Sequence, residues 1–264
     1  MQEADHDQEI SIDAPWGGLY IDGDWETPEG RDRIDIRNPT TQESITEVPA
    51  ATEEDVDRAF EAATRAQTAW AETTPDERAA VVRRTADLID EYEAEIREIL
   101  AVETGAAKPR QDIEHGGTVT FVHDAASFAF RSSGGHNQSK IPGKKNIIRK
   151  EPVGVVGVIS PWNVPMKLSI RAVAAAIAPG NSAVLKPAQE STISVGLLLA
   201  RLWRFMELPR LPPHRGRLVL VVVGVAAAAA IAYCLGRADD WQNATRLVFG
   251  LEPVGGGHPL TVGA

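Results

Sequence analysis

The chain has 264 residues, 43% of them hydrophobic and 24% charged, which suits one or two folded domains and excludes a disordered or collagen-like chain. Its 37 acidic residues outnumber its 27 basic residues, and the net charge of -10 argues against nucleic acid as a partner, because phosphate backbones need basic surface. The single cysteine, Cys234, excludes a disulfide framework and a cysteine-based zinc cluster, so we expect no metal site.

The first predicted elements are short strands that follow an acidic tail. Residues 1–16 lack the basic and apolar regions of a signal peptide, so we expect a solvated, disordered tail there. Residues 19–25 and 34–37 have strand character, and the Asp-Gly and Asn-Pro dipeptides at 22–23 and 38–39 mark turns.

Two helices are predicted next from their start signals. Thr52 can cap the first helix, with Asp55 three residues later as a weak capping box. A stronger signal starts at Thr74, with proline at the first helical position and glutamate at the third, and this helix is expected to run to about residue 100. The first helix carries apolar residues at helical spacing that we expect to face a core: Val56, Phe60, Ala63 and Trp70.

The most informative stretch has the pattern of a parallel α/β sheet. It alternates strand, helix, strand, helix at residues 153–159, 166–178, 182–186 and 192–204. The first strand is an unbroken β-branched run, which predicts burial on both faces. Ligands bind beyond the carboxyl ends of such strands, here at the loops 160–165 and 186–191. The G-x-G-x-x-G dinucleotide motif does not occur in the sequence.

Two sequence motifs surround these loops. One is Pro-Val-Gly-Val-Val-Gly-Val-Ile-Ser-Pro-Trp-Asn-Val-Pro at 152–165, and the other is Ala-Pro-Gly-Asn-Ser-Ala-Val-Leu-Lys-Pro-Ala at 178–188. Both resemble the nucleotide-binding strands and loops of the aldehyde dehydrogenase family, and shorter matches lie upstream at 38–39, 48–52, Trp70 and 103–105. The resemblance covers residues 17–204. It implies an incomplete Rossmann-like parallel sheet that binds NAD or NADP and an aldehyde.

The resemblance also implies roles for individual residues. A set of side chains would line the cofactor cleft: Ile159, Ser160, Pro161, Trp162, Asn163, Lys186 and Gln189. Asn163 would donate its side-chain amide to the oxyanion that forms when a thiolate attacks the aldehyde, and Lys186 would hydrogen-bond the adenosine ribose. Where Gln189 stands, the family often has an acid that favours NAD, so the choice between NAD and NADP stays open. From the residues alone, Asn163 could instead complete a tight loop and Lys186 could extend to water.

Two further segments resemble family features. Residues 140–150 correspond to the arm that joins subunits, which implies a homo-oligomer, although a lysine-rich stretch by itself indicates a solvated loop. The sequence Arg-Ala-Val-Ala at 171–174 is similar to branches that oxidise aromatic aldehydes.

The resemblance ends near residue 204. The later motifs of the family, which carry its catalytic cysteine and general-base glutamate, do not occur in this sequence. Cys234 lies in an apolar run, which opposes thiolate formation. We therefore expect a chain truncated before its catalytic residues, which binds NAD or NADP weakly and oxidises no aldehyde by itself.

The carboxyl-terminal part is predicted to differ from the rest. Residues 205–217 form a proline-rich joint and residues 237–264 a loop-rich tail. Between them, residues 218–236 are 19 residues without a charge, enough for a transmembrane helix with its amino side in the cytoplasm, although a buried helix competes. Two hypotheses follow. One is a cytoplasmic, truncated aldehyde dehydrogenase relative, produced by a frameshift or fusion. The other is a membrane-anchored protein that uses the half-domain for binding or assembly without catalysis.

Overall fold

The computed structural model describes residues 18–131, 134–197, 199 and 220–222. The amino-terminal elements are β1 (Leu19–Ile21), β2 (Asp24–Glu26), β3 (Arg33–Arg37), β4 (Ser44–Pro49), α1 (Glu53–Ala71), α2 (Pro75–Glu91), α3 (Glu93–Thr104), α4 (Lys108–Ala126) and the 3-10 turn η1 (Ser127–Phe130). Then follow β5 (Gly135–Gln138), β6 (Lys145–Ile148), β7 (Val155–Ile159), α5 (Pro165–Ile177), β8 (Ser182–Lys186), the 3-10 turn η2 (Gln189–Ser191), the π-helix η3 (Thr192–Leu197) and β9 (Leu220–Val222).

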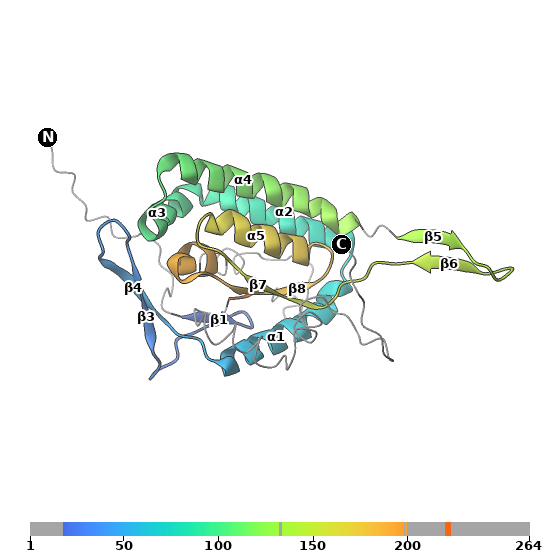
Figure 1. Cartoon of the computed structure of the whole chain (residues 1–264), viewed down its shortest axis with the longest axis horizontal. Coiled ribbons are helices and arrows are strands. Elements are labelled where there is room, and N and C mark those ends of the chain that lie inside the picture. Colours follow the sequence, from blue (N-terminus) through green and yellow to red (C-terminus); the bar gives the residue numbers. More distant parts are fainter. Residues whose placement is uncertain (1–17, 132–133, 198, 200–219, 223–264) are drawn as a thin grey trace, which may run out of the picture.

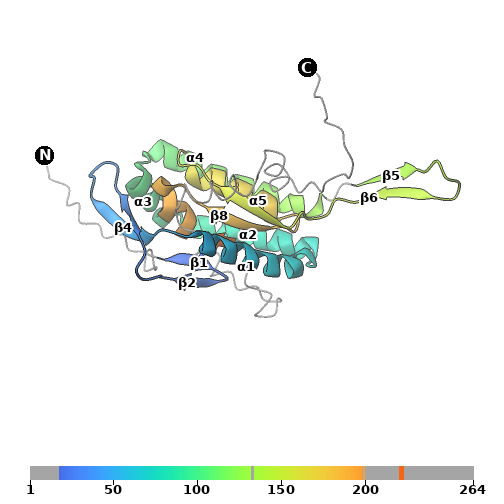
Figure 2. The same ribbon diagram turned by 60° about the horizontal axis from the view of Figure 1, so that its bottom comes forward.

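A mixed sheet with strand order β2-β1-β9-β8-β7 lies at the centre of the described part. β8 is parallel to β7 and to β9, whereas β1 is antiparallel to β9 and β2. Figures 1 and 2 show α1 on one face of this sheet and α5 on the other, with α2 and α4 beyond α5. Alanines let α1 approach the sheet closely, since Ala59 and Ala63 are fully buried in one cluster with Leu19 and Val184. The predicted α/β class is confirmed.

Both predicted helix starts are confirmed. In each capping box, the hydroxyl of Thr52 or Thr74 accepts the backbone N–H three residues on, and the acid there accepts the threonine N–H. The prediction of one helix from residue 74 to 100 is wrong. At Tyr92 the backbone (φ -101°, ψ 22°) leaves the helical conformation, so α2 ends and α3 begins there. The buried face continues across the break, which is why the apolar pattern did not indicate it.

Two predictions of burial are also wrong. Phe60 on α1 is 37% exposed and lies outside the core, beside Gly157. β7 is not buried on both faces, because Val158 is the only one of its five residues that is buried, and it is an edge strand among the described residues. Its end residue Ile159 is 60% exposed, whereas Val158 is buried. The β-branched run therefore predicted the strand correctly, but the burial of the strand depends on the elements that pack against it.

Side chains from α1, α2 and the following turn fix the carboxyl end of α5. The last carbonyls of a helix have no partner within it. Here Asn181 Nδ2 donates to the Ala176 carbonyl at 2.9 Å, and Trp70 Nε1 donates to the Ile177 carbonyl at 2.9 Å. The Arg78 guanidinium donates through Nε to the Ala178 carbonyl at 3.0 Å. These contacts join α1 and α2, which lie on opposite sides of the sheet, to the helix that follows β7.

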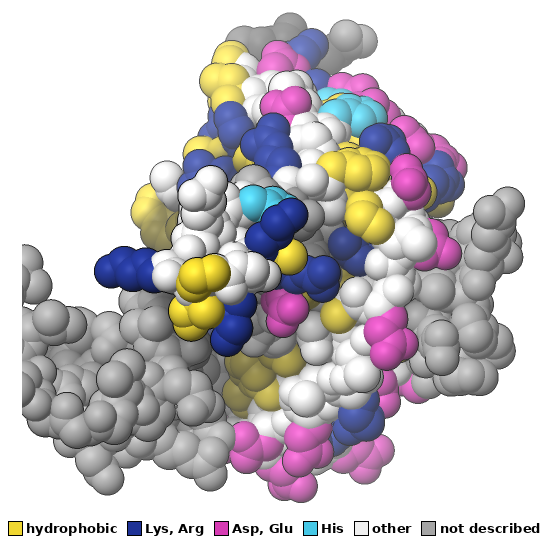
Figure 3. All heavy atoms as spheres, turned by 90° about the vertical axis from the view of Figure 1, so that its right-hand side faces the viewer, with side chains coloured by type: hydrophobic (Ala, Val, Ile, Leu, Met, Phe, Trp, Pro, Cys, Tyr) yellow, Lys and Arg dark blue, Asp and Glu magenta, His cyan; other side chains and the backbone are white. Residues whose placement is uncertain are grey.

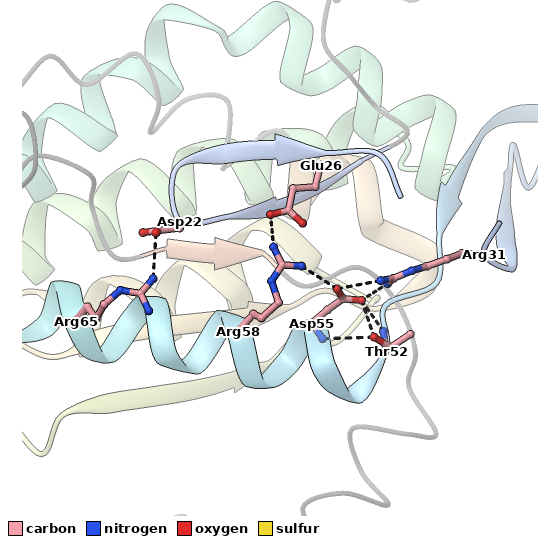
Figure 4. Close-up of polar contacts among 7 residues, drawn as sticks. All are labelled: Asp22, Glu26, Arg31, Thr52, Asp55, Arg58 and Arg65. Atoms are coloured by element: carbon pink, nitrogen blue, oxygen red, sulfur yellow. Dashed lines mark hydrogen bonds and ion pairs between the residues drawn. The ribbon is translucent and has the colours of Figure 1, made fainter. Parts of the chain in front are cut away.

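A polar cluster joins the β1–β2 hairpin to α1 (Figure 4). Arg58 pairs with Glu26 of the hairpin and with Asp55 of its own helix, and Arg31 also pairs with Asp55. Burial raises the pKa of the Asp55 carboxyl, but hydrogen bonds from Arg31 and Thr52 lower it, so that the pKa lies below its ordinary value. The carboxylate is therefore ionised at neutral pH and holds both arginines.

The predicted apolar segment 218–236 lies outside the described residues except for β9. Residues 220–222 form a strand between β8 and β1, so the prediction of a helix is wrong for these three residues. No helix among the residues that the structure describes is long and apolar enough to cross a membrane. The tail 1–16, the joint 205–217 and the tail 237–264 lie outside the described residues, as do residues 198 and 200–204 of the helix predicted for 192–204, whose first part is η3.

Candidate cofactor site

The carboxyl ends of β7 and β8 lie side by side. The two strands pair in parallel with Ile159 opposite Lys186, and the Ser160 N–H donates to the Lys186 carbonyl at 3.0 Å. The loops 160–164 and 187–188 therefore leave the same edge of the sheet. This is the position at which open α/β sheets bind ligands.

The first loop presents most of its predicted residues to solvent. Ile159 and Trp162 are each 60% exposed, and Pro161 and Asn163 are exposed as well. No hydrogen bond joins the Asn163 side chain to another described residue, which favours a role in ligand binding over one in closing a tight loop. Ser160 differs, because it is buried and its hydroxyl contacts that of Ser169 on α5. Ser160 therefore shapes the loop and offers a ligand little side-chain surface.

The second loop begins at Lys186, which is half-buried. Its Nζ donates to the Pro187 carbonyl at 3.0 Å, so the ammonium group stays near the strand end and does not extend fully to water. Burial lowers the pKa of Lys186, and the nearby Glu190 carboxylate opposes that effect. Gln189 is exposed at the start of η2. The structure thus brings Ile159 and Lys186 together, with the other predicted residues on the two adjoining loops.

A buried glutamate lies at the amino end of α5. The N-cap of α5 is Val164, which has no side-chain acceptor for the free N–H groups of the first turn. Glu114 of α4 takes that role from a distant part of the chain, because its Oε2 accepts the Met166 N–H at 3.1 Å. Its Oε1 accepts from Arg110 Nε at 3.1 Å. Burial raises the pKa of Glu114, and the Met166 N–H and Arg110 partly offset this.

A second buried glutamate holds the segment that follows β8. Glu103 of α3 is 3% exposed, and its two oxygens accept the N–H groups of Ile193 at 2.6 Å and Ser194 at 2.7 Å. Burial raises the pKa of Glu103 to about 7, although the two backbone donors favour the ionised form. The sequence pattern included residue 103 only within a short motif and did not identify Glu114. Their partners are backbone amides far along the chain, which no local spacing indicates.

The predicted subunit arm is a separate hairpin, β5–β6, which projects from the body in Figure 1. Figure 3, which faces that side, shows Lys and Arg side chains gathered over it and acidic side chains toward the lower edge. Ile141, Ile147 and Ile148 on this arm are more than half exposed. A hollow of about 500 Å³ lies along the hairpin and involves none of the residues predicted to bind the cofactor. The exposed apolar and basic surface is compatible with the predicted subunit contact, which stays a prediction.

Comparison with known proteins agrees with this geometry. The family model described as aldehyde dehydrogenase family matches residues 25–226, beyond the limit near 204 that the sequence motifs indicated. A second family model, described as the alpha/beta-hydrolase family N-terminus, matches residues 192–264 and overlaps the first.

Curated relatives and solved structures give the same family. The chain is 39% identical to vanillin dehydrogenase from Corynebacterium glutamicum over 73% of this chain and 39% of the relative. It is 36% identical to benzaldehyde dehydrogenase [NAD(+)] from Pseudomonas putida, over 74% of this chain and 40% of the relative. The crystal structure of an NAD-dependent benzaldehyde dehydrogenase from Corynebacterium glutamicum matches with a TM-score of 0.75 at 36% identity, and the match covers 84% of this chain and 47% of that one. The chain thus spans about two fifths of the length of these curated relatives, and it belongs to the aldehyde dehydrogenase family.

Proposed function

We propose that this chain forms the first part of an NAD(P)-binding site of aldehyde dehydrogenase type. The observation that carries the proposal is the parallel register of β7 and β8, which places Ile159 beside Lys186 and leaves Trp162 and Asn163 exposed on the adjoining loop. A half-buried lysine at the end of β8 and an exposed indole on the loop after β7 suit the ribose and the flat rings of a dinucleotide.

The proposed substrate class is aromatic aldehydes. The relatives named for vanillin and benzaldehyde support this class, as does the Arg-Ala-Val-Ala sequence at 171–174 on α5. The name of one relative also supports NAD, but the uncharged Gln189 leaves NADP as an equal candidate.

Within this site, Asn163 is proposed as the oxyanion donor. When a thiolate adds to an aldehyde, the carbonyl oxygen becomes an anion, and an amide N–H in place there stabilises it as the new bond forms. The thiolate and the general base of the family reaction have no match in the 264 residues, and Cys234 lies outside the described residues. We therefore propose that the chain binds its cofactor weakly and oxidises no aldehyde alone.

The carboxyl-terminal part is proposed to derive from a second family. The hydrolase-family match at residues 192–264 supports a fusion, because it overlaps the end of the aldehyde dehydrogenase match. The exposed β5–β6 hairpin supports association into a homo-oligomer through the arm.

The proposed binding is tested by saturation-transfer NMR, which detects millimolar affinity. NAD and NADP are titrated separately into the full chain, and we expect signals from the adenosine protons that Lys186→Ala abolishes. Lys108→Ala, a change at an exposed lysine on α4, is the matched control and should leave the signals unchanged. Equal signals from the Lys186 variant, or none from the wild type with either nucleotide, would contradict the proposal. Steady NAD(P)H production from vanillin, abolished by Cys234→Ser, would contradict the proposed lack of activity.

A further inference from the structure

Two buried carboxylates lie behind the two loops of the candidate site. Glu103 and Glu114 are 3% and 0% exposed, and both belong to the helical layer formed by α3 and α4. Glu114 accepts one backbone N–H from the first turn of α5, and Glu103 accepts two from the start of η3, which follows β8 and η2. The contacts join residues that are 52 to 91 positions apart in sequence.

Glu114 takes the place of a side-chain cap that α5 lacks. An α-helix leaves N–H groups without partners in its first turn, and a nearby Ser, Thr, Asp or Asn usually accepts them. α5 is preceded by Val164, and the structure records no side-chain cap for it. A buried N–H without an acceptor costs about as much as a lost hydrogen bond. The start of α5, and with it the end of loop 160–164, therefore depends on Glu114.

We propose that Glu103 and Glu114 are positioning residues for the cofactor cleft, Glu114 for loop 160–164, which contains Asn163, and Glu103 for the segment between β8 and η3, which contains Gln189. This inference rests on the proposed function. Each loop is then held at both ends. Where the loops leave the strands, the Ser160 N–H bonds the Lys186 carbonyl, and at their far ends the glutamates bond the helix starts.

The two glutamates differ in whether a cationic side chain pairs with them. Glu114 has a cationic partner in Arg110, whereas no charged side chain of the described residues pairs with Glu103. Around Glu103, the titratable groups on the packed elements are engaged elsewhere or exposed. His115 of α4 faces Asp90 and Glu93, Glu190 of η2 is exposed, and η3 contains no titratable residue.

The charge state of Glu103 therefore decides how firmly it holds its segment. An ionised carboxylate accepts both N–H groups, whereas a neutral carboxyl group has one hydroxyl that donates and so must release one of them. Because burial raises the pKa of Glu103 to about 7, this change falls within the neutral range. The raised pKa also means that the folded segment holds this proton more tightly than an exposed carboxyl group would, so openings that bring Glu103 to water should become easier as the pH rises from 6 to 8.

The test measures amide hydrogen exchange in the full chain, normalised to intrinsic rates. The side chain of Gln replaces one acceptor oxygen of Glu by an NH₂ donor. The backbone amide of Met166 should therefore exchange at least about tenfold faster in Glu114→Gln. The same increase is expected for the backbone amide of Ile193 or Ser194 in Glu103→Gln. Glu98→Gln on α3 is the matched control. The Ser182 amide, which bonds the Gly154 carbonyl, is the internal reference. In the wild type, protection at Ile193 and Ser194, normalised to intrinsic rates, should fall from pH 6 to 8, because the closed segment binds the Glu103 proton more tightly than the opened one.

Saturation-transfer NMR with NAD and NADP then links these contacts to the site. We expect weaker nucleotide signals in both glutamate variants than in the wild type at the same pH. Unchanged exchange in the variants overturns the inference, and so does faster exchange with wild-type nucleotide signals. If exchange responds but the wild type binds neither nucleotide, the proposed function has failed, and the cofactor role of the two glutamates fails with it.

Discussion

Replacing Arg78 by alanine should be among the most damaging single changes in the described part of the chain. The guanidinium is buried between α2 and the carboxyl end of α5, where Nε donates to the Ala178 carbonyl at 3.0 Å and Nη1 donates to the Thr73 carbonyl. Burial lowers the pKa of Arg78, yet an arginine stays protonated at all accessible pH values. Its charge also lies at the negative end of the α5 dipole.

The expected loss follows from these contacts. A hydrogen bond from a charged donor contributes about 1.5–3 kcal/mol, and a buried carbonyl left without a partner carries its own desolvation cost. Two such bonds, together with the packing of the side-chain stem, lead us to expect a loss of about 3–4 kcal/mol in the free energy of unfolding. Arg78→Lys keeps the charge but not the two-pronged geometry and should lose less.

Urea unfolding of the full chain, followed by tryptophan fluorescence, measures this loss. At a slope of roughly 2 kcal/mol per molar, the midpoint should fall by about 1.5–2 M. Arg83→Ala, a change at an exposed arginine on the same helix, is the control and should cost less than about 0.5 kcal/mol. If the two alanine variants unfold at the same urea concentration, the contacts between α2 and α5 do not stabilise the fold as argued.

Three further outcomes are expected. The native state keeps the proton of Glu103 to a higher pH than the unfolded chain does. The free energy of unfolding of the wild type should therefore fall by about 3 kcal/mol between pH 5 and 8, relative to that of Glu103→Gln. If urea unfolding gives both proteins the same dependence on pH, this prediction is contradicted. Gly180→Ala should destabilise the fold more than Gly143→Ala does. Both glycines have a positive φ, but only at position 180 would the added Cβ lie 2.9 Å from the ring of a proline, Pro152. Equal melting temperatures of the two variants would contradict this steric argument. Association through the basic arm should weaken in high salt and in a Lys144→Glu, Lys145→Glu variant, as sedimentation would detect; a mass independent of both would exclude an electrostatic contact there.

Local chemistry made the helix starts and the two strands predictable. The hydroxyl of Thr74 and the carboxylate of Glu77 act on backbone groups within one turn, so four residues of sequence contain the whole interaction. The same holds for β7 and β8, which are short, largely apolar runs between prolines, with a helix between them. The positions of the two site loops followed directly from that alternation.

Features set by distant neighbours were not predictable. Nothing within β7 indicates whether another strand lies beside it, so the exposure of Ile159 depends on the rest of the sheet. The break at Tyr92 leaves the apolar stripe intact. Glu103 and Glu114 looked like ordinary helix glutamates, because their partners are backbone amides that carry no residue signature. At the site, the sequence thus identified the exposed groups, while the groups that hold the loops became visible only in the fold.

β9 allows a test of whether the segment shared by both family matches belongs to this fold. Residues 220–222 lie between β8 and β1, with Val221 opposite Val184, so the strand connects the β1–β2 hairpin to the parallel strands. Proline has no N–H and is poorly tolerated in a strand with neighbours on both sides. Val221→Pro should therefore cost about 3 kcal/mol in urea unfolding and expose the hairpin amides to exchange, whereas Val221→Thr, which keeps the N–H and the β-branched shape, should cost far less. If the proline variant is as stable as the threonine variant, the sheet does not depend on β9, and the overlap of the two family matches near residues 220–222 contributes nothing to the stability of the aldehyde dehydrogenase part.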